Sequence, residues 1–433
     1  MTFANQISSS LWAATAPDRT PAAALAGQAE TDVAVIGGGF SGLSTALHLA
    51  REGIRVTVLE GAAVGFGGSG RNNGQVIPTM TAAEPDAIEA RFGDVGERFV
   101  GLIRDSAAYL FDTARAEDID CEGEQTGWFQ PAHRASRMAL SEKRVEAWSK
   151  RGAPARLVDR EEAARLLGSE QWFGGMYNAT GGHINPLALA RGLAGACEAR
   201  GVTIHENCPV ASVERKDGKW HLVTASGAVL VARSVMLATN AYTGFHERKL
   251  APTVARSLVP VLSWQMATAP LTDAQRETIV PGRQAVSDTH GDLRFFRYDK
   301  RNRLVAGGAL AVPVNGPERL KALVGKRLAE AFPALGTPTF DYVWNGFIGM
   351  TEDRLPFITR LGPDFWCWAG CNGRGVALSI SLGRELAGAI AGRPLEELAL
   401  PLSEPKPIPM HDLVTRLALP VFLPYYRWRD TRD

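Results

Sequence analysis

Residues 32–60 constrain the fold of this chain more than any other stretch. An apolar run, residues 32–36, leads directly into glycines with G-x-G-x-x-G spacing, at Gly37, Gly39 and Gly42. Apolar residues then recur at helical spacing as far as Gly53, and a second apolar run ends at Glu60. The order strand, glycine turn, helix, strand and terminal acid predicts a βαβ unit that binds a dinucleotide.

Each residue type in this unit has a chemical reason. Gly37 permits the tight turn, Gly39 lets a pyrophosphate approach the backbone, and Gly42 lets the helix pack on its strand. The N–H groups and the positive dipole end of the helix hold the phosphates, and Glu60 can accept two hydrogen bonds from a ribose diol. The predicted nucleotide contacts are Gly37, Gly39, Phe40, Ser41, Gly42, Glu60 and Gly61.

A second glycine-rich stretch, residues 65–75, repeats the spacing at Gly65, Gly67 and Gly70, but no strand and helix surround it. We therefore do not interpret it as a second phosphate turn. Its backbone N–H groups and the Arg71 cation suit another contact with the pyrophosphate or with a planar polar ring, and the alternative is a mobile surface loop. The predicted contacts here are Gly68, Ser69, Arg71, Asn72, Asn73, Gly74 and Gln75.

Two later segments return to the same predicted sheet. The first is a helix with Asn185 as N-cap and Pro186 as first residue, a strand at 202–205 and a β-meander over 210–238. The second is a buried strand at 365–369, a glycine-rich turn and a helix to residue 390. Further predicted contacts are Val210, Ala238, Thr239, Asn240, Gly346, Gly370, Gly373, Arg374, Gly375 and Val376.

These returns predict an α/β fold with a Rossmann-type cofactor-binding domain that is discontinuous in sequence, over residues 30–83, 181–245 and 346–400. Residues 84–180 and 246–345 are predicted to form a substrate domain with a mixed or antiparallel sheet and helices. Residues 1–29 are interpreted as a loosely packed lead-in. Residues 401–433 form a tail whose aromatic and basic end lies on the body or on a partner, with a membrane-surface role as the minor alternative.

Composition excludes several classes of function. Forty-seven basic and 46 acidic residues leave a formal net charge of +1, so no global field favours nucleic acid. No apolar run reaches the roughly 18 residues that span a bilayer, and no signal pattern is visible, so a cytoplasmic protein is expected. Five cysteines without a CxxC argue against a disulfide framework, and Cys367 and Cys371 alone do not predict a metal site.

The cofactor follows from the count of fingerprints. A single credible βαβ fingerprint leaves no second site for a pyridine nucleotide, which favours FAD reduced directly by an organic substrate. A reduced flavin carries negative charge at its N1–C2=O edge. The last predicted helix N-terminus, with Arg374 beside it, would stabilise that charge.

The motifs resemble the D-amino acid oxidase superfamily of flavoenzymes, and within it the γ-glutamylputrescine oxidase-like branch. Besides the fingerprint, they are the sequences at 68–75, 181–186, 238–242 and 370–376. The resemblance implies FAD and oxidation of a C–N bond to an imine, which water hydrolyses to a carbonyl compound and an amine. It also implies that oxygen is reduced to hydrogen peroxide.

The chain departs from the branch at three positions, where Asn73 replaces Gly and Asn185 and Arg374 each replace His. No cysteine stands near Gly346, where the resemblance would place a covalent link, so FAD is expected to be non-covalent. Residues 304–307 also lack the lysine that related oxidases use for oxygen.

The substrate is expected to be a small-molecule amine with an extended chain, such as a γ-glutamyl or N-alkyl amine. No side chain is an obvious base, and loss of the ammonium proton can suffice. Two alternatives stay open: an amino acid or N-methylamino acid oxidase or dehydrogenase with an arginine that clamps the carboxylate, and a flavin-binding structural subunit.

The predicted substrate wall combines aromatic and polar side chains around Arg374, although a half-buried sheet explains the aromatics equally well and His183 is more often structural. Aromatic side chains beside a flavin exclude water and so favour the neutral amine. The candidates are Arg374, His183, Tyr298, Trp344, Trp264 and Phe296.

Overall fold

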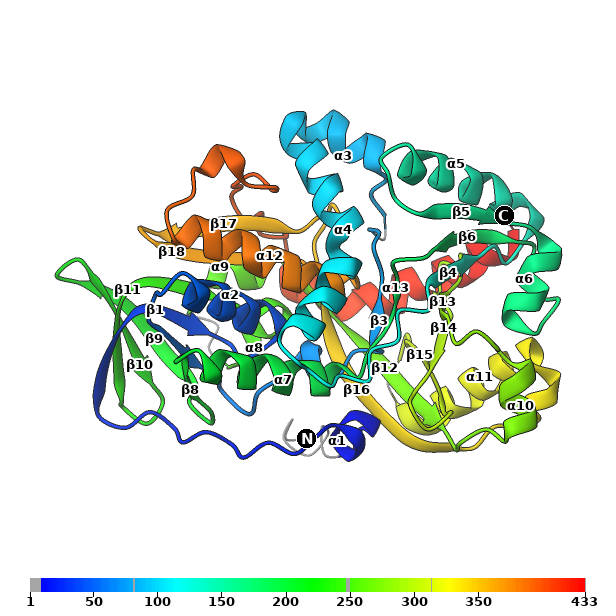
Figure 1. The fold of residues 1–433 in the computed structure, drawn as a ribbon, viewed down its shortest axis with the longest axis horizontal. Coiled ribbons are helices and arrows are strands. Elements are labelled where there is room, and N and C mark those ends of the chain that lie inside the picture. Colours follow the sequence, from blue (N-terminus) through cyan, green and yellow to red (C-terminus); the bar gives the residue numbers. More distant parts are fainter. Residues whose placement is uncertain (1–8, 81, 247–249, 313, 433) are drawn as a thin grey trace.

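Two eight-stranded sheets organise the chain (Figure 1). The computed structural model describes residues 9–80, 82–246, 250–312 and 314–432. The first sheet has the order β17-β18-β11-β1-β2-β8, and its neighbours pair in parallel except for β17 with β18. Its strands are β1 (Gln28–Ile36), β2 (Val56–Leu59), β8 (Thr203–His205), β11 (Val229–Leu237), β17 (Phe357–Gly362) and β18 (Phe365–Ala369), with β9 (Val210–Lys216) and β10 (Lys219–Thr224) continuing from β11.

The central strands come from distant parts of the sequence, which confirms the predicted α/β fold with a discontinuous Rossmann-type sheet. β1 lies between β2 and β11, and β18 lies beyond β11. Val33 and Val35 pack into one hydrophobic core, whereas Ala34 and Ile36 pack into another. Both faces of β1 are therefore buried at residues 33–36, as the apolar run there predicts.

Helices α2 (Phe40–Arg51), α7 (Pro186–Ala199) and α12 (Gly375–Ile390) lie together against the first sheet (Figure 1). The predicted cap of α7 is confirmed, because Asn185 Oδ1 accepts a hydrogen bond from Ala188 N at 3.2 Å. The polar stretch after residue 84 forms α3 (Pro85–Phe92) and α4 (Asp94–Ala116), which break at Gly93 with φ at +57°.

The second sheet is almost entirely antiparallel, with the order β16-β12-β15-β14-β13-β4-β6-β5 and one parallel pair, β13 with β4. Its strands are β4 (Trp128–Pro131), β5 (Ala155–Val158), β6 (Gly175–Asn178), β12 (Val259–Thr268), β13 (Ala285–Ser287), β14 (Phe295–Tyr298), β15 (Leu304–Gly308) and β16 (Phe340–Met350). The longer helices of this part are α5 (Met138–Ser149), α6 (Arg160–Leu167), α10 (Asp273–Thr278) and α11 (Gly316–Ala331).

Short elements connect the two sheets. A two-stranded ribbon, β3 (Gln75–Val76) with β7 (Gly182–His183), is separate from both large sheets. Helices α8 (Thr243–His246) and α9 (Pro252–Arg256) lie in the chain between β11 and β12. No helix in the described ranges is both long and apolar enough to cross a membrane.

Both ends of the described chain pack on the body. The interpretation of the N-terminal stretch as loosely packed is wrong at α1 (Leu11–Thr15), which buries Leu11 and Trp12 completely and in which Trp12 Nε1 donates to Asn72 O at 2.8 Å. Residues 17–24, by contrast, are exposed or half-buried. Residues 1–8 lie outside the described residues. At the other end, α13 (His411–Arg432) packs against β12.

Arg297 on β14 joins the two sheets from a buried position. Its Nε donates to Asn73 O at 2.8 Å, its Nη2 to Ile184 O at 2.7 Å and its Nη1 to Tyr298 O at 2.7 Å. The guanidinium also lies 4.4 Å from the ring centroid of Trp12. Burial lowers the pKa of Arg297 to about 10, so the group stays charged at neutral pH.

We expect Arg297→Leu to lower the free energy of unfolding by on the order of 3 kcal/mol or more, because it removes three charge-assisted hydrogen bonds and leaves buried carbonyls without donors. Urea unfolding measures the change. Arg233→Leu is the control, since Arg233 is largely exposed and pairs with Asp32 at the surface, where an ion pair contributes about 0–1 kcal/mol. Equal losses in the two variants would contradict the role of Arg297.

Candidate functional site

A single cavity of about 1060 Å³ lies where the two sheets meet. It runs from the glycine turn after β1, past the loop at 66–75, to the strands β12 and β16, and then to α13. This volume lies at the upper end of the roughly 300–1,000 Å³ that is typical of small-molecule and cofactor pockets. The cavity is therefore large enough for a cofactor.

The glycine turn after β1 forms one end of the cavity. Gly37 has φ at +113°, and a Cβ there would lie 2.9 Å from Ala238 O, so glycine is required. Gly39, at the start of α2, lines the cavity. Gly42 does not line it, and a Cβ at Gly42 would lie 2.0 Å from Gly37 O, so its role is close packing of helix and turn.

Glu60 lies at the same end, at the C-terminus of β2. Its Oε2 accepts from Gly38 N at 2.6 Å and its Oε1 accepts from Ala62 N at 2.9 Å. Burial raises the pKa of Glu60, and these two N–H donors act against the rise. Each carboxylate oxygen keeps a further lone pair, so Glu60 can still accept from a diol that enters the cavity.

The loop at 68–75 is an ordered wall of the cavity. Ser69 Oγ accepts from Phe40 N at 2.9 Å, which ties the loop to the start of α2. Arg71 donates from Nε to Phe66 O at 2.6 Å and from Nη1 to Asn345 O at 3.3 Å, and its Nη2 is buried without a hydrogen-bond partner among the described residues.

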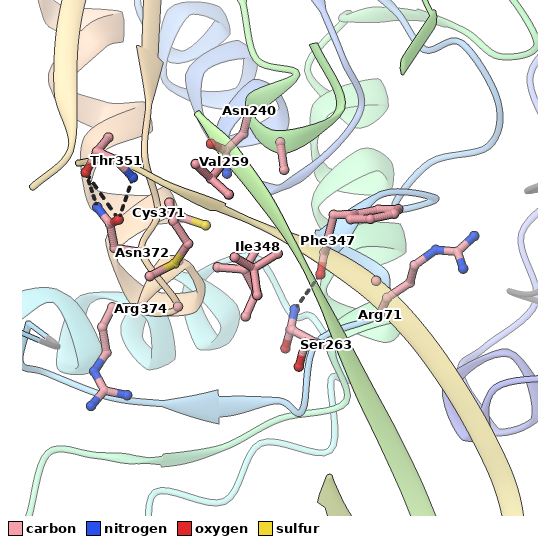
Figure 2. A pocket seen from close by; sticks show the side chains of 18 of the residues that line it. Arg71, Asn240, Val259, Ser263, Phe347, Ile348, Thr351, Cys371, Asn372 and Arg374 are labelled. Atoms are coloured by element: carbon pink, nitrogen blue, oxygen red, sulfur yellow. Dashed lines mark hydrogen bonds between the residues drawn. The ribbon is translucent and has the colours of Figure 1, made fainter. Parts of the chain in front are cut away.

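Two asparagines hold together the chain segments around the last helix N-terminus. Asn240 Oδ1 accepts from Gly370 N at 3.0 Å, and Asn372 Oδ1 accepts from Thr351 N at 2.9 Å, as Figure 2 shows for Thr351. Asn372 itself has φ at +49°, in the left-handed region that Asn tolerates better than most residues. The ends of β11, β16 and β18 are thereby fixed at one place.

Arg374 is the N-cap residue of α12 and lines the cavity from a buried position. Its Nε has no hydrogen-bond partner among the described residues, and its guanidinium lies 5.6 Å from the ring centroid of Trp128. Burial, and to a lesser degree the Arg144 cation, lowers the pKa of Arg374 to about 10. In Figure 2, Arg374 and Arg71 lie on opposite sides of Cys371 and Ile348. No acid of the described residues pairs with Arg374 or raises its pKa.

The predicted aromatic wall is wrong in its residues, because strand alternation turns them away from the cavity. On β12 the lining residues include Ser263 and Gln265, so Trp264 faces the opposite side. On β14, Phe295 lines the cavity and Phe296 packs in the core of the second sheet. Tyr298 lies in that core too.

His183 and Trp344 are also structural. His183 is buried on β7, its Nε2 lies 3.0 Å from Arg283 O, and burial holds its pKa well below the usual value. Trp344 is buried on β16, and its Nε1 donates to Arg71 O at 2.8 Å. Trp344 therefore supports the cavity wall from behind.

The sequence analysis missed much of the wall that the structure does show. Apolar residues of β12, β16 and α13 line the cavity, and so does a loop in which His290 Nδ1 lies 2.6 Å from Asp288 Oδ2. Cys371, which was not among the predicted site residues, also lines it. The missed apolar lining residues include Val259, Val261, Ile348, Met350, Leu293, Phe295, Val414, Leu419, Phe422 and Leu423.

The predicted cofactor contacts are largely brought together. Those that do not line the cavity are Gly42, Gly74 and Gly370, which lie behind it at close backbone contacts. A dinucleotide fits these groups: helix N–H donors and a carboxylate at one end, and two guanidiniums with unpartnered nitrogens at the other. The predicted contacts that line the cavity are Gly37, Gly39, Phe40, Ser41, Glu60, Gly61, Gly68, Ser69, Arg71, Asn72, Asn73, Gln75, Val210, Ala238, Thr239, Asn240, Gly346, Gly373, Arg374, Gly375 and Val376.

The chain is similar to known proteins over most of its length. Residues 32–389 match the family model DAO, described as FAD dependent oxidoreductase. The chain is 32% identical over 404 residues to the probable oxidoreductase OrdL of Haemophilus influenzae, covering 92% of each chain. It is 32% identical over 386 residues to γ-glutamylputrescine oxidoreductase of Escherichia coli, covering 89% of each. Glycine oxidase of Geobacillus kaustophilus has a similar fold, with a TM-score of 0.70, 22% identity and coverage of 84% of this chain and 95% of that one.

We expect Glu60→Gln to weaken binding of FAD to the apoprotein by about 1.5–3 kcal/mol, because a charged hydrogen-bond acceptor for the ribose is lost. Titration of the apoprotein with FAD, followed by flavin fluorescence, measures the change. Glu206→Gln is a matched control: Glu206 is a buried carboxylate that accepts from Val64 N at 2.6 Å but does not line the cavity. If the two variants bind FAD equally well, Glu60 does not contact the cofactor.

Proposed function

The chain belongs to the DAO family of FAD-dependent oxidoreductases, and from this membership we propose that it oxidises the C–N bond of a small-molecule amine. The product is an imine, which water hydrolyses to a carbonyl compound and an amine, and molecular oxygen is the final electron acceptor. The 32% sequence identity to a γ-glutamylputrescine oxidoreductase, over an alignment that covers 89% of the chain, supports this substrate class. An amine with an extended chain, γ-glutamyl or N-alkyl, is the proposed substrate.

The observation that carries the proposal is the apolar wall that continues the cavity beyond the cofactor contacts. Val261 on β12 and Ile348 on β16 line its middle part, and Leu419 on α13 lines the far part. Such a wall excludes water, so an ammonium group would lose its hydration there. The wall therefore favours the neutral amine, which is the form that the oxidation requires. Because the cavity is lined by both β16 and α13, a long substrate could extend from one to the other.

The proposed mode of cofactor binding uses the two ends of the cavity. The N–H groups at the start of α2 would hold the pyrophosphate and Glu60 would hold the ribose. When bound, FAD supplies the acceptor for the hydride of the substrate. Arg374 would then stabilise the negative charge that develops on the reduced ring system, since it is a buried cation at a helix N-terminus and pairs with no acid of the described residues.

We propose that FAD is held without a covalent bond. Cys371 lines the cavity and its Sγ lies 3.8 Å from Gly349 O. Cys367, by contrast, is buried in β18. Burial raises the pKa of its thiol to about 12, which disfavours the nucleophilic thiolate that a covalent bond to FAD would require. Flavin that remains with acid-precipitated protein would contradict the proposal and would direct attention to Cys371.

A second candidate is an amino acid or N-methylamino acid oxidase or dehydrogenase. Arg374 favours it, because its buried Nε has no hydrogen-bond partner among the described residues, and its guanidinium could donate two parallel hydrogen bonds to a substrate carboxylate. The two candidates differ in whether the substrate carries its carboxylate next to the reacting carbon or at the far end of an extended chain.

We expect N-alkyl or γ-glutamyl amines to reduce the flavin faster than D-alanine or glycine does. Anaerobic mixing with a panel of amines and amino acids, followed by the loss of flavin absorbance, measures the rates. Peroxide release after admission of air then distinguishes oxidase from dehydrogenase. Faster reduction by D-alanine or glycine would favour the second candidate, and no reduction by any amine would favour a structural flavoprotein.

We expect Arg374→Ala to slow flavin reduction by on the order of a hundredfold, as removal of a preorganised charge-stabilising group does elsewhere. Arg374→Lys keeps the charge and should recover part of the rate. Stopped-flow absorbance measures the rates at equal FAD content, and the reduction potential of each variant is measured in parallel. Unchanged rate and potential in Arg374→Ala would show that the guanidinium contacts neither flavin nor substrate.

A further inference from the structure

Exposed apolar side chains concentrate on α13 and at its start. Elsewhere in the described residues such side chains are scattered, as at Leu157 and Leu395. Along 410–428, by contrast, seven large hydrophobic side chains are exposed, and Met410, Val421 and Trp428 show 73%, 55% and 50% of their surface. The exposed apolar residues of this segment are Met410, Leu413, Leu417, Val421, Phe422, Tyr425 and Trp428.

These residues form one stripe along the helix. Leu413, Leu417, Val421, Tyr425 and Trp428 follow each other at intervals of four or three, which places their side chains on the same helix face. We name these five residues the outer stripe. A contiguous apolar stripe of this kind on a surface indicates an interaction site.

The opposite face of α13 is firmly attached to the body, so the outer stripe is not exposed through loose packing. Arg427 Nε donates to Asp292 Oδ2 at 2.7 Å, and the Asp430 carboxylate accepts from Gly291 N at 2.8 Å and from Asp292 N at 3.1 Å. Near the N-terminus of the helix, His411 Nε2 lies 2.7 Å from Leu258 O. The helix thus presents the outer stripe in a fixed orientation.

Arginines outnumber acids among the exposed charged residues of the described part of α13, which are Asp412, Arg416 and Arg432. The exposed charged residues between positions 413 and 432 are Arg416 and Arg432, while the one acid of that range, Asp430, is buried in the contacts just described. The Arg432 guanidinium lies 4.7 Å from the ring centroid of Trp428. Apolar side chains with Trp, Tyr and flanking arginines are the composition of helices that lie in the interface of anionic bilayers.

We propose that α13 docks on the surface of a membrane that contains anionic lipids, with the outer stripe inserted at the level of the headgroups and Arg416 and Arg432 paired with lipid phosphates. The helix lies in the plane of the interface and does not cross the bilayer. A second copy of the chain fits less well, because an interface of two such faces brings together four arginines and leaves only Asp412, at the start of each helix, as an exposed acid of α13.

Vesicle sedimentation of the FAD-loaded full chain tests the proposal. We expect binding to vesicles of phosphatidylcholine with phosphatidylglycerol, weaker binding to phosphatidylcholine alone, and a loss of binding as salt is raised. The variant Arg416→Gln with Arg432→Gln should bind anionic vesicles roughly 30-fold more weakly, from about fivefold for each arginine.

The triple variant Leu417→Ser, Val421→Ser, Trp428→Ser should lose vesicle binding while it keeps its FAD content, because none of the three residues lines the cavity. The matched control is Leu157→Ser with Leu395→Ser, which removes exposed apolar groups away from α13 and should bind as the unchanged chain does. Binding that the triple variant retains, or no binding by the unchanged chain, would overturn the proposal. If light scattering showed a dimer that only the triple variant dissociates, a second copy would be the occupant.

Discussion

The cavity depends on a buried cation that has carbonyl groups as its direct hydrogen-bond partners. Arg297 reaches from the second sheet to the backbone of residues 73 and 184, which belong to the connection between the sheets. Carbonyl dipoles satisfy the guanidinium donors without adding an acid to the site. Gly74 makes this approach feasible, because a Cβ there would lie 2.3 Å from Arg297 Nη2. The loop at 68–75 therefore has one position, and with it one wall of the cavity.

The cofactor half of the site could be predicted because its determinants are local in sequence. Gly37 is required by its own turn, Glu60 ends its own strand, and Asn185 caps the helix that it begins. Spacing between neighbours in the chain reports such constraints directly. The same local logic placed Arg374 at a helix N-terminus, where the structure has it.

The substrate half could not be predicted because it depends on which face of a strand meets the cavity. Phe295 and Phe296 are adjacent, yet one lines the cavity and the other packs in the core. The two-residue period of a strand shows that the two side chains point to opposite faces of the sheet, but not which of them faces the cavity. The contributions of Trp12 and α13 are even less visible, since both come from chain ends whose sequences resemble loose tails and whose partners lie far away along the chain.

The strand order of the first sheet has a consequence for how the protein is made. β18 occupies an inner position beside β11, although residues 37–364 separate it from β1 in the sequence. A polypeptide that is still being synthesised cannot complete this sheet before β18 has been made, and until that point the edge of β11 that β18 later occupies lacks its partner. The late segment then completes the sheet, and the contacts of Asn240 and Asn372 hold it in place.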